Sequence, residues 1–437
     1  MFPNGFLWGA STASAQIEGG FDEDGKTLSI WDAAPSSRIK TGENCHIADD
    51  HYHRYKEDVA LMKELGLKSY RFSVSWPRIV PEENTVNPKG IAFYGALVDE
   101  LLKNGIEPIV TLYHWDLPLW LQEKGGWRNK EIIQHFAFYT KAVIQELSDR
   151  VTWWLTMNEP QCFVLNGYLT KVHAPFECRP FSISAIIKNV MLANKDAVDV
   201  IRKYAVLPPK VGLSFGSGAF IPEDETDENS IEKARQDSFY RSMGSMNNRL
   251  WFDPMLSGKS VSTYLIYHVG KKTAKRAKTD FDFLALNNYE AFNYSPWGVG
   301  KTDRSKLKTN SLGWTVDGRS LYWTCRFIYE RYHLPILITE NGYCDEDILT
   351  DNAVNDPERI SYMDEYIAYV GKAIGDGVPI LGYHYWSFMD NFEWAEGFTP
   401  RFGLVYVDYK TQKRIPKRSA YRYKEIIETN GTCLGQR

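Results

Sequence analysis

The chain has 437 residues, of which 43% are hydrophobic and 24% are charged, which are ordinary values for a globular protein with a large core. Its formal charge is -4, from 51 Lys and Arg against 55 Asp and Glu, so we expect no nucleic-acid partner. The sequence lacks the long apolar run of a membrane-spanning helix, and MFPNGFLWGA at the N-terminus lacks the basic and apolar regions of a secretory signal.

Short apolar runs rich in β-branched and aromatic residues recur along the chain and predict β-strands. Runs such as PIVTL and PILIT are apolar at consecutive positions, which is typical of strands covered on both faces. In chain order, the predicted strands are Phe6–Ala10, Ser69–Val74, Pro108–Leu112, Val151–Thr156, Val211–Phe215, Phe281–Leu286, Pro335–Thr339 and Ile380–Trp386.

Segments with helical periodicity lie between these strands. Asn87-Pro88 begins one helix and Asn104-Gly105 ends it, while Asp356-Pro357 begins another. Alternating strands and helices without a linker predict an α/β fold, a single closed (β/α)8 TIM barrel. We expect one domain over residues 1–437, with enlarged βα loops and a disordered tail of a few residues. An open doubly wound sheet is the alternative, but no G-x-G-x-x-G follows an early strand.

The carboxyl ends of the strands are where a barrel of this kind carries its active site. Glu159 and Glu340 directly follow two very apolar strands, and a closed barrel would bring them to one rim despite their separation in sequence. The polar and aromatic residues at or just beyond the strand ends are His114, Asp116, Asn158, Glu159, Asn287, Tyr289, Glu340, Asn341, Trp386, Glu393 and Trp394.

Two buried carboxyl groups on one rim suit a specific chemistry. Burial and mutual repulsion raise the pKa of one of them, so that it stays protonated while its neighbour is ionised. Cleavage of a glycosidic bond needs this pair, because one group protonates the leaving oxygen and the other attacks the sugar carbon. Taken alone, Glu159 or Glu340 is equally well explained as a cap for the next helix. Together, and beside Trp386, Trp394 and His114, they favour catalysis.

Several long stretches resemble family 1 glycoside hydrolases, the β-glucosidase group, and the resemblance runs from Phe2 to about Ile427. The matching stretches are FPNGFLWGASTASAQIEG (2–19), DHYHRYKEDVALMKELGLKSYRFSVSWPRI (50–79), YHWDLP (113–118), TMNEP (156–160), LNNY (286–289), ITENG (338–342) and YWSFMDNFEWAEGF…RFGLVYVD (385–408). The resemblance implies a TIM barrel that cleaves β-glycosides with retention of configuration through a covalent glycosyl-enzyme.

The resemblance also implies a role for each matching residue. Glu340 in ITENG is similar to the family's nucleophile, and Glu159 in TMNEP to its acid/base. Arg71 and Tyr289 would hold Glu340 and keep it ionised. The implied substrate-binding set is Gln16, His114, Asn158, Asn287, Tyr289, Trp386, Glu393 and Trp394, with Asn158 on the sugar 2-hydroxyl and Trp386 as a stacking platform.

Two features of the sequence bear on the substrate. Family members that cleave 6-phosphosugars replace the Glu-Trp that stands here as Glu393 and Trp394, and a carboxylate repels a phosphate dianion. We therefore expect unphosphorylated substrates. Lys171 and Phe176 stand where the family usually has glycine, so we expect the leaving-group side to differ from that of other members.

We therefore expect a retaining β-glucosidase that acts on small-molecule β-D-glucosides or oligosaccharides, with β-galactosides and β-fucosides as further candidates. A glycan-binding pseudoenzyme and a mainly transglycosylating enzyme stay as alternatives, whereas a nicotinamide-dependent dehydrogenase has no phosphate loop to support it. We expect no cofactor, no metal and no membrane partner, and the sequence leaves the oligomeric state open. Six scattered cysteines without a C-x-x-C pair favour a reducing, cytoplasmic location.

Overall fold

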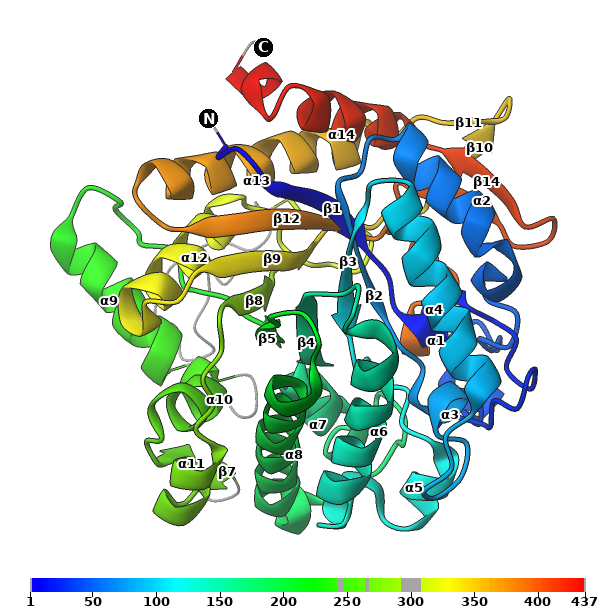
Figure 1. The fold of residues 1–437 in the computed structure, drawn as a ribbon. Coiled ribbons are helices and arrows are strands. Elements are labelled where there is room, and N and C mark those ends of the chain that lie inside the picture. The colour runs from blue at the N-terminus through cyan, green and yellow to red at the C-terminus, as the bar shows by residue number, and fades with distance from the viewer. Residues whose placement is uncertain (1, 242–246, 264–266, 292–307, 436–437) are drawn as a thin grey trace.

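The computed structural model describes residues 2–241, 247–263, 267–291 and 308–435. Its centre is a closed barrel of eight parallel strands in the order β1-β12-β9-β8-β5-β4-β3-β2, with helices packed around it (Figure 1). The barrel strands are β1 (Leu7–Ser11), β2 (Ser69–Ser73), β3 (Glu107–Thr111), β4 (Trp153–Asn158), β5 (Lys210–Gly216), β8 (Leu284–Asn287), β9 (Ile336–Asn341) and β12 (Ile380–Trp386). The predicted (β/α)8 barrel is confirmed.

Several strands run further at their carboxyl ends than the sequence predicts. β4 continues past the predicted end at Thr156 to Asn158, which stands opposite Ser214 of β5. In the same way Asn287 of β8 stands opposite Glu340 of β9. The apolar pattern stops before these polar residues, but backbone pairing continues to the rim of the barrel. Asn158, Asn287 and Glu340 therefore belong to the barrel strands themselves, which hold them in place.

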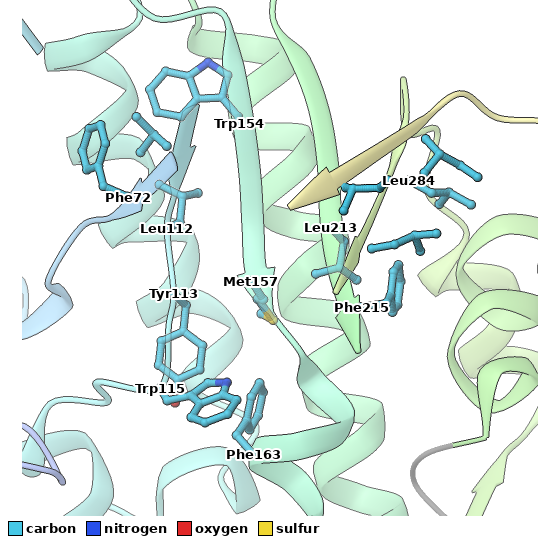
Figure 2. Packing of buried hydrophobic residues seen from close by; sticks show 14 of the residues in the cluster. Phe72, Leu112, Tyr113, Trp115, Trp154, Met157, Phe163, Leu213, Phe215 and Leu284 are labelled. Carbon is cyan, nitrogen blue, oxygen red and sulfur yellow. The ribbon is translucent and has the colours of Figure 1, made fainter. Parts of the chain in front are cut away.

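Apolar side chains pack both inside the barrel and between the barrel and its helices. Alternate residues of a strand point to opposite faces, so Trp153 and Leu155 face inward while Trp154 faces the helices. Figure 2 shows Trp154 in this outer layer, together with Leu213 and Phe215 of β5. The inner cluster consists of Ile109, Trp153, Leu155, Phe283, Ala285 and Leu337. It fills the barrel near the amino ends of the strands, which leaves the carboxyl ends for polar groups.

The predicted helix boundaries are mostly confirmed. Asn87 caps α4, because its side-chain oxygen accepts a hydrogen bond from the Lys89 amide at 3.2 Å. Asp356 precedes α13 as expected, but its carboxylate accepts hydrogen bonds from Arg359 and Ser419 instead of capping the helix. The helices are α1 (Ser14–Ile17), α2 (His51–Glu64), α3 (Trp76–Ile79), α4 (Pro88–Lys103), α5 (Leu119–Glu123), α6 (Ile132–Leu147), α7 (Pro160–Tyr168), α8 (Ile183–Tyr204), α9 (Glu228–Tyr240), α10 (Asn248–Phe252), α11 (Lys271–Ala277), α12 (Arg319–Tyr332), α13 (Pro357–Gly375) and α14 (Arg418–Glu428).

The enlarged loops that follow barrel strands carry short ribbons of their own. They pair β6 (Val261–Thr263) with β7 (Tyr267–Val269), β10 (Leu349–Thr350) with β11 (Ala353–Val354), and β13 (Val405–Asp408) with β14 (Lys413–Pro416). Among the helices in the described ranges, none combines the length and apolar character needed to cross a membrane. The last two residues of the predicted tail lie outside the described residues.

Candidate active site

A pocket of about 420 Å³ is lined by residues from the carboxyl ends of the strands and the loops that follow them. It collects most of the predicted site residues: His114, Asn158, Glu159, Asn287, Tyr289, Glu340, Trp386, Glu393 and Trp394. Gln16 and Arg71 are fully buried beneath the pocket wall, where they hydrogen-bond residues that line it. The structure therefore brings all the predicted site residues into one assembly.

Glu159 stands at the junction of β4 and α7. It precedes Pro160, the first residue of α7, and has a left-handed backbone with a φ of 43°. Its side-chain Oε1 accepts a hydrogen bond from Asn287 Nδ2 at 2.7 Å. The carboxyl group also lies against Gly216 at the end of β5, where an added Cβ would come within 3.1 Å of Glu159 Cδ. Gly216 therefore makes room for the carboxyl group in the pocket wall.

Glu340 occupies a charged environment at the end of β9. Arg71 donates from Nη1 to Glu340 Oε1, and the Tyr289 hydroxyl donates to Oε2 at 2.6 Å. The Arg71 side chain is completely buried and the Glu340 side chain is 5% exposed, so water screens this ion pair little. Both carboxylate oxygens of Glu340 thus have a donor, and one of those donors carries a full positive charge.

A continuous chain of hydrogen bonds connects the two carboxyl groups. From Arg71, Nη2 donates to Asn158 Oδ1 at 2.7 Å, and Nε donates to Thr111 Oγ1 at 2.8 Å. Asn287 Nδ2 donates to the same Asn158 oxygen at 3.0 Å and to Glu159. Five barrel strands, β2, β3, β4, β8 and β9, supply the groups of this chain, which explains how residues far apart in sequence are held in fixed relative positions.

Burial raises the pKa of both carboxyl groups. For Glu340 the raised pKa is about 7, because burial and the charge of Glu159 together outweigh the opposing effect of Arg71. Arg71 and Tyr289 both lower the pKa of Glu340, in the expected direction, and that they keep Glu340 ionised stays a prediction. The two groups compete for ionisation, because each negative charge disfavours the other. Arg71 contacts Glu340, which favours placing the negative charge there and the proton on Glu159.

Several buried polar atoms at the pocket lack a hydrogen-bond partner among the described residues: Gln16 Oε1 and His114 Nδ1 of the predicted substrate-binding set, and His173 Nδ1 and Ser217 Oγ elsewhere in the lining. Gln16 Nε2 donates to Asn391 at 2.9 Å and lies 3.4 Å from Glu393 Oε2. Burial and the charge of Arg71 lower the pKa of His114 well below its usual value, so its ring is neutral. Its Nε2 pairs with Asn158 at 3.0 Å, which leaves Nδ1 as a donor. A ligand rich in hydroxyl groups would satisfy Gln16 Oε1 and His114 Nδ1.

Aromatic rings give the pocket flat apolar surfaces beside these polar groups. The His114 ring stacks between Trp386 and Trp394, with centroid distances of 5.7 Å and 5.9 Å. On another part of the wall, Tyr289 and Trp314 have centroids 5.5 Å apart. Trp rings present apolar faces that suit the C–H faces of a sugar.

Sequence reasoning missed several residues that line the pocket. They are Trp115, Cys162, Asn166, His173, Gly216, Ser217, Glu290, Leu312, Trp314, Glu396 and Phe402. Trp115 and Cys162 were within reach, because one lies inside the YHWDLP stretch and the other follows TMNEP by two positions. Leu312 and Trp314 lie on the long connection between β8 and α12, where no periodic pattern indicates which residues turn inward.

The pocket therefore combines two desolvated carboxyl groups, unpaired polar atoms and aromatic surfaces. Over the ranges that the structure describes, no three or more His, Cys, Asp or Glu side chains gather as they would around a metal ion. A closed (β/α)8 barrel with such a pair at its carboxyl end defines the class of barrel enzymes that cleave glycosidic bonds.

Comparisons with known proteins agree with this class. The family model for glycosyl hydrolase family 1 matches residues 1–432. Beta-glucosidase A of Thermotoga maritima is 40% identical, over 98% of this chain and 98% of that protein. The aryl-phospho-beta-D-glucosidase of Bacillus subtilis is 36% identical, over 99% of this chain and 98% of that protein. A solved structure of the Thermotoga maritima beta-glucosidase with glucoimidazole superimposes with a TM-score of 0.89 at 40% identity, covering 98% and 99% of the two chains.

The chain belongs to glycosyl hydrolase family 1. Within that family it is an O-glycosyl hydrolase of the β-glucosidase type.

Proposed function

We propose that this enzyme hydrolyses unphosphorylated β-D-glucosides with retention of configuration, with Glu340 as the nucleophile and Glu159 as the acid/base. The observation that carries the proposal is the contrast between the two carboxyl groups. Glu340 contacts the guanidinium of Arg71, whereas the amide of Asn287 donates to Glu159. A nucleophile must be ionised and a general acid must hold a proton, and these contacts favour that division.

The reaction would proceed in two steps. In the first, a Glu340 oxygen bonds to the anomeric carbon while Glu159 gives its proton to the glycosidic oxygen, whose bond to that carbon breaks. In the second, Glu159 takes a proton from water, and the resulting hydroxide displaces Glu340 from the same carbon. Asn158, held by Arg71 and close to both carboxyl groups, would bind the sugar 2-hydroxyl.

The glycone would lie against Trp386, with its hydroxyl groups on the polar side of the pocket. The unpaired Gln16 Oε1 and His114 Nδ1 support this placement, because Gln16 Oε1 would accept a hydrogen bond from a sugar hydroxyl and His114 Nδ1 would donate one to a hydroxyl oxygen. Glu393, beside Gln16, would accept further hydroxyl protons together with Trp394. Because the discrimination between glucose and galactose would fall on Gln16 and Glu393, β-galactosides and β-fucosides are further candidate substrates.

The charges of the pocket wall favour unphosphorylated sugars. Five glutamates line it, namely Glu159, Glu290, Glu340, Glu393 and Glu396, and the described lining residues include no Lys or Arg. A phosphate dianion needs Arg or Lys donors and is repelled by carboxylates. In this respect we expect the chain to differ from the aryl-phospho-beta-D-glucosidase of Bacillus subtilis.

The apolar side chains of Leu312, Trp314 and Phe402 line the same pocket and would face the leaving group. They favour small aryl or sugar aglycones. In the second step, transfer of the glycosyl group to an acceptor alcohol would compete with hydrolysis. The glycan-binding alternative is disfavoured because both carboxyl groups face the pocket. The cytoplasmic location and the single domain over residues 1–437 stay predictions.

The test is the anomeric configuration and the sugar preference of the purified enzyme. Nuclear magnetic resonance during hydrolysis of an aryl β-glucoside should show the β-anomer of glucose first, with the α-anomer growing later by mutarotation. Rates on glucose, galactose, fucose, xylose and 6-phosphoglucose substrates should rank glucose first and 6-phosphoglucose last. An α-anomer as the first product, or a preference for the phosphosugar, contradicts the proposal.

A further inference from the structure

Three buried polar side chains meet beneath the pocket. Asn287 ends β8, and the hydroxyl groups of Ser214 on β5 and Thr339 on β9 reach it from the two neighbouring strands. Asn287 is 1% exposed, and Ser214 and Thr339 are fully buried. Neither Ser214 nor Thr339 is among the described residues that line the pocket, and the reaction proposed above gives them no task.

The two hydroxyl groups converge on the carbonyl oxygen of the Asn287 side chain. Ser214 Oγ donates to Asn287 Oδ1 at 2.8 Å, and Thr339 Oγ1 donates to the same oxygen at 2.7 Å. The two hydroxyl oxygens are also within hydrogen-bond distance of each other, at 2.9 Å. An amide oxygen has two lone pairs, so two hydroxyl donors satisfy this buried acceptor completely.

The nitrogen of the same amide serves the reacting groups. Asn287 Nδ2 donates to Glu159 Oε1 at 2.7 Å and to Asn158 Oδ1 at 3.0 Å, which uses both of its hydrogens. Asn158 Oδ1 also accepts a hydrogen bond from Arg71 Nη2, a group that can only donate. The Asn287 atom that faces this oxygen must therefore be the nitrogen. With its carbonyl side matched to two donors, the amide is held in the orientation that gives Glu159 an N–H donor.

Charged and titratable groups also face Glu159 from the surrounding elements. They are Arg71 on β2, Glu340 on β9, Cys162 on α7, Tyr289 after β8 and Glu393 after β12. Ser214 and Thr339 are uncharged, so replacing them adds or removes no charge near Glu159. Their hydroxyl hydrogen bonds go to Asn287, to each other and to the Leu286 carbonyl. Within the described part of the chain, these bonds reach Glu159 only through Asn287.

We propose that Ser214 and Thr339 are positioning residues for the acid/base: together they hold the Asn287 amide so that its N–H group faces Glu159. The inference rests on the role proposed above for Glu159. Without the two hydroxyl groups, Asn287 Oδ1 is buried without a donor, which is costly. The amide then turns or moves away, and the Glu159 carboxylate loses a donor that stabilises it. Glu159 becomes a weaker acid.

The first test removes both hydroxyl groups and changes the size of the side chains little. When Ser214→Ala is combined with Thr339→Val, kcat/KM for a β-glucoside with a poor leaving group should fall about 10-fold. The alkaline limb of its pH profile should move up by about 0.5–1 pH unit, because the pKa of Glu159 rises when the donor is lost. An activated dinitrophenyl glucoside needs little proton donation and should lose less than about 3-fold.

Control variants separate this effect from a general loss of packing. Thr339→Ser in place of Thr339→Val returns a donor to Asn287 and should recover most of the rate and of the shift. Thr140→Val makes the same change at a fully buried threonine of α6, whose hydroxyl group has no hydrogen-bond partner among the described residues, and should leave the profile unchanged. Circular dichroism checks that each variant is folded. If the double variant is not, Ser214→Ala alone should show the same difference between leaving groups at a smaller size.

The second test shows whether the two hydroxyl groups act through Asn287. Asn287→Ala removes the amide and its donor to Glu159, so it should lower kcat/KM and move the alkaline limb upward by itself. In this background, adding Ser214→Ala and Thr339→Val should change kcat/KM less than about 2-fold and should not move the limb further. Substitutions that act through one shared partner are not additive once that partner is gone.

The outcomes separate this inference from the proposed function. An unmoved alkaline limb with equal losses for both leaving groups, or losses that add in full to those of Asn287→Ala, overturns the positioning role. In that case Glu159→Ala can still lose hydrolysis of poor leaving groups and respond to azide, which leaves the proposed function intact. If Glu159→Ala keeps full activity, the acid/base assignment itself is wrong.

Discussion

The two sides of the pocket differ in what surrounds their carboxyl groups. On the Glu340 side, a fully buried Arg71 and the Tyr289 hydroxyl donate to the carboxylate. On the Glu159 side, the donor is the Asn287 amide, which is neutral. The two residues are chemically identical and similarly buried, so their amino-acid type does not divide the roles.

The side chains around each carboxyl group therefore set its chemistry. Burial raises the pKa of both groups, which makes a protonated carboxyl available in the pocket. Coulombic attraction to Arg71 then favours the charge on Glu340, since opposite charges in a buried site interact strongly. Substitutions on one side of the pocket at a time test this difference.

The largest effect should come from removing the nucleophile. Glu340→Ala should lower kcat/KM on aryl β-glucosides by about 10⁴-fold or more, because no covalent intermediate can form. Far-ultraviolet circular dichroism should show an unchanged fold. Hydrolysis at the original rate in a sample free of contaminating glycosidase would refute the assignment of Glu340.

Removing the Glu159 carboxyl group should lower the rate of hydrolysis by an amount that depends on the leaving group. Glu159→Ala should slow substrates with poor leaving groups by about 10²–10⁴-fold, the usual contribution of a general acid, and slow activated dinitrophenyl glucosides much less. Azide should restore the rate on activated substrates and yield a β-glucosyl azide, identified by mass spectrometry. Equal losses for all leaving groups would contradict the acid/base role.

Replacing Arg71 with an uncharged residue should leave the Glu340 carboxyl group without a positively charged donor. Arg71→Met leaves Glu340 buried without its cation, which we expect to cost about 3–5 kcal/mol of unfolding free energy. The pKa of Glu340 should rise further, and a carboxyl group with a raised folded pKa costs stability as the pH rises through that pKa. The loss in urea unfolding should therefore be larger at pH 8 than at pH 5.

A partly exposed ion pair provides the control for that experiment. Arg326 pairs with Glu330 at 2.8 Å on α12, with the Arg326 side chain 31% exposed. Arg326→Met should cost less than about 1 kcal/mol. Similar losses of unfolding free energy in Arg71→Met and Arg326→Met would mean that burial does not make the Arg71–Glu340 pair costlier to break.

The smallest effect should come from replacing Glu393, which belongs to the proposed sugar-binding residues. Burial and the charge of Glu340 raise its pKa to about 8, so the folded protein holds a proton that the unfolded chain releases above about pH 4.5. Stability should therefore fall as the pH rises from 5 to 8. Glu393→Gln should remove this fall and gain about 1–2 kcal/mol at pH 8, an amount reduced for partial exposure.

The same substitution should lower kcat/KM for β-glucosides about 10–100-fold, because a sugar hydroxyl loses one of the two carboxyl oxygens that could accept its hydrogen bond. Glu396→Gln is the matched control, since its partner Lys40 is exposed and the pair lies at the surface. It should change stability by less than about 0.5 kcal/mol. A stability gain at pH 8 in Glu396→Gln but not in Glu393→Gln would contradict the assignment of the buried charge.

Most of the barrel was predictable because its signals are local. Apolar runs mark buried strands, and Asn87-Pro88 marks the start of α4. The ends of β4 and β9 were placed too early, since backbone pairing into Asn158 and Asn341 depends on neighbouring strands. Asp356-Pro357 marks the start of α13 in the same way, although the Asp356 carboxylate accepts hydrogen bonds from Arg359 and Ser419 instead of capping the helix.

The site was predictable where a residue stands at a strand end or inside a matching stretch. Glu159 and Glu340 were found for that reason, and the structure places both in one pocket. Leu312 and Trp314 were not found, because an irregular connection carries no periodic signal.

The sequence by itself determined the eight strands, their order along the chain and the two carboxyl groups at strand ends, because hydrophobic periodicity and chain direction are local properties. Only the tertiary structure decided that Arg71 contacts one glutamate while Asn287 contacts the other. Proton affinity in a buried site depends on desolvation and on charges a few ångströms away, and those distances exist only once the barrel has closed.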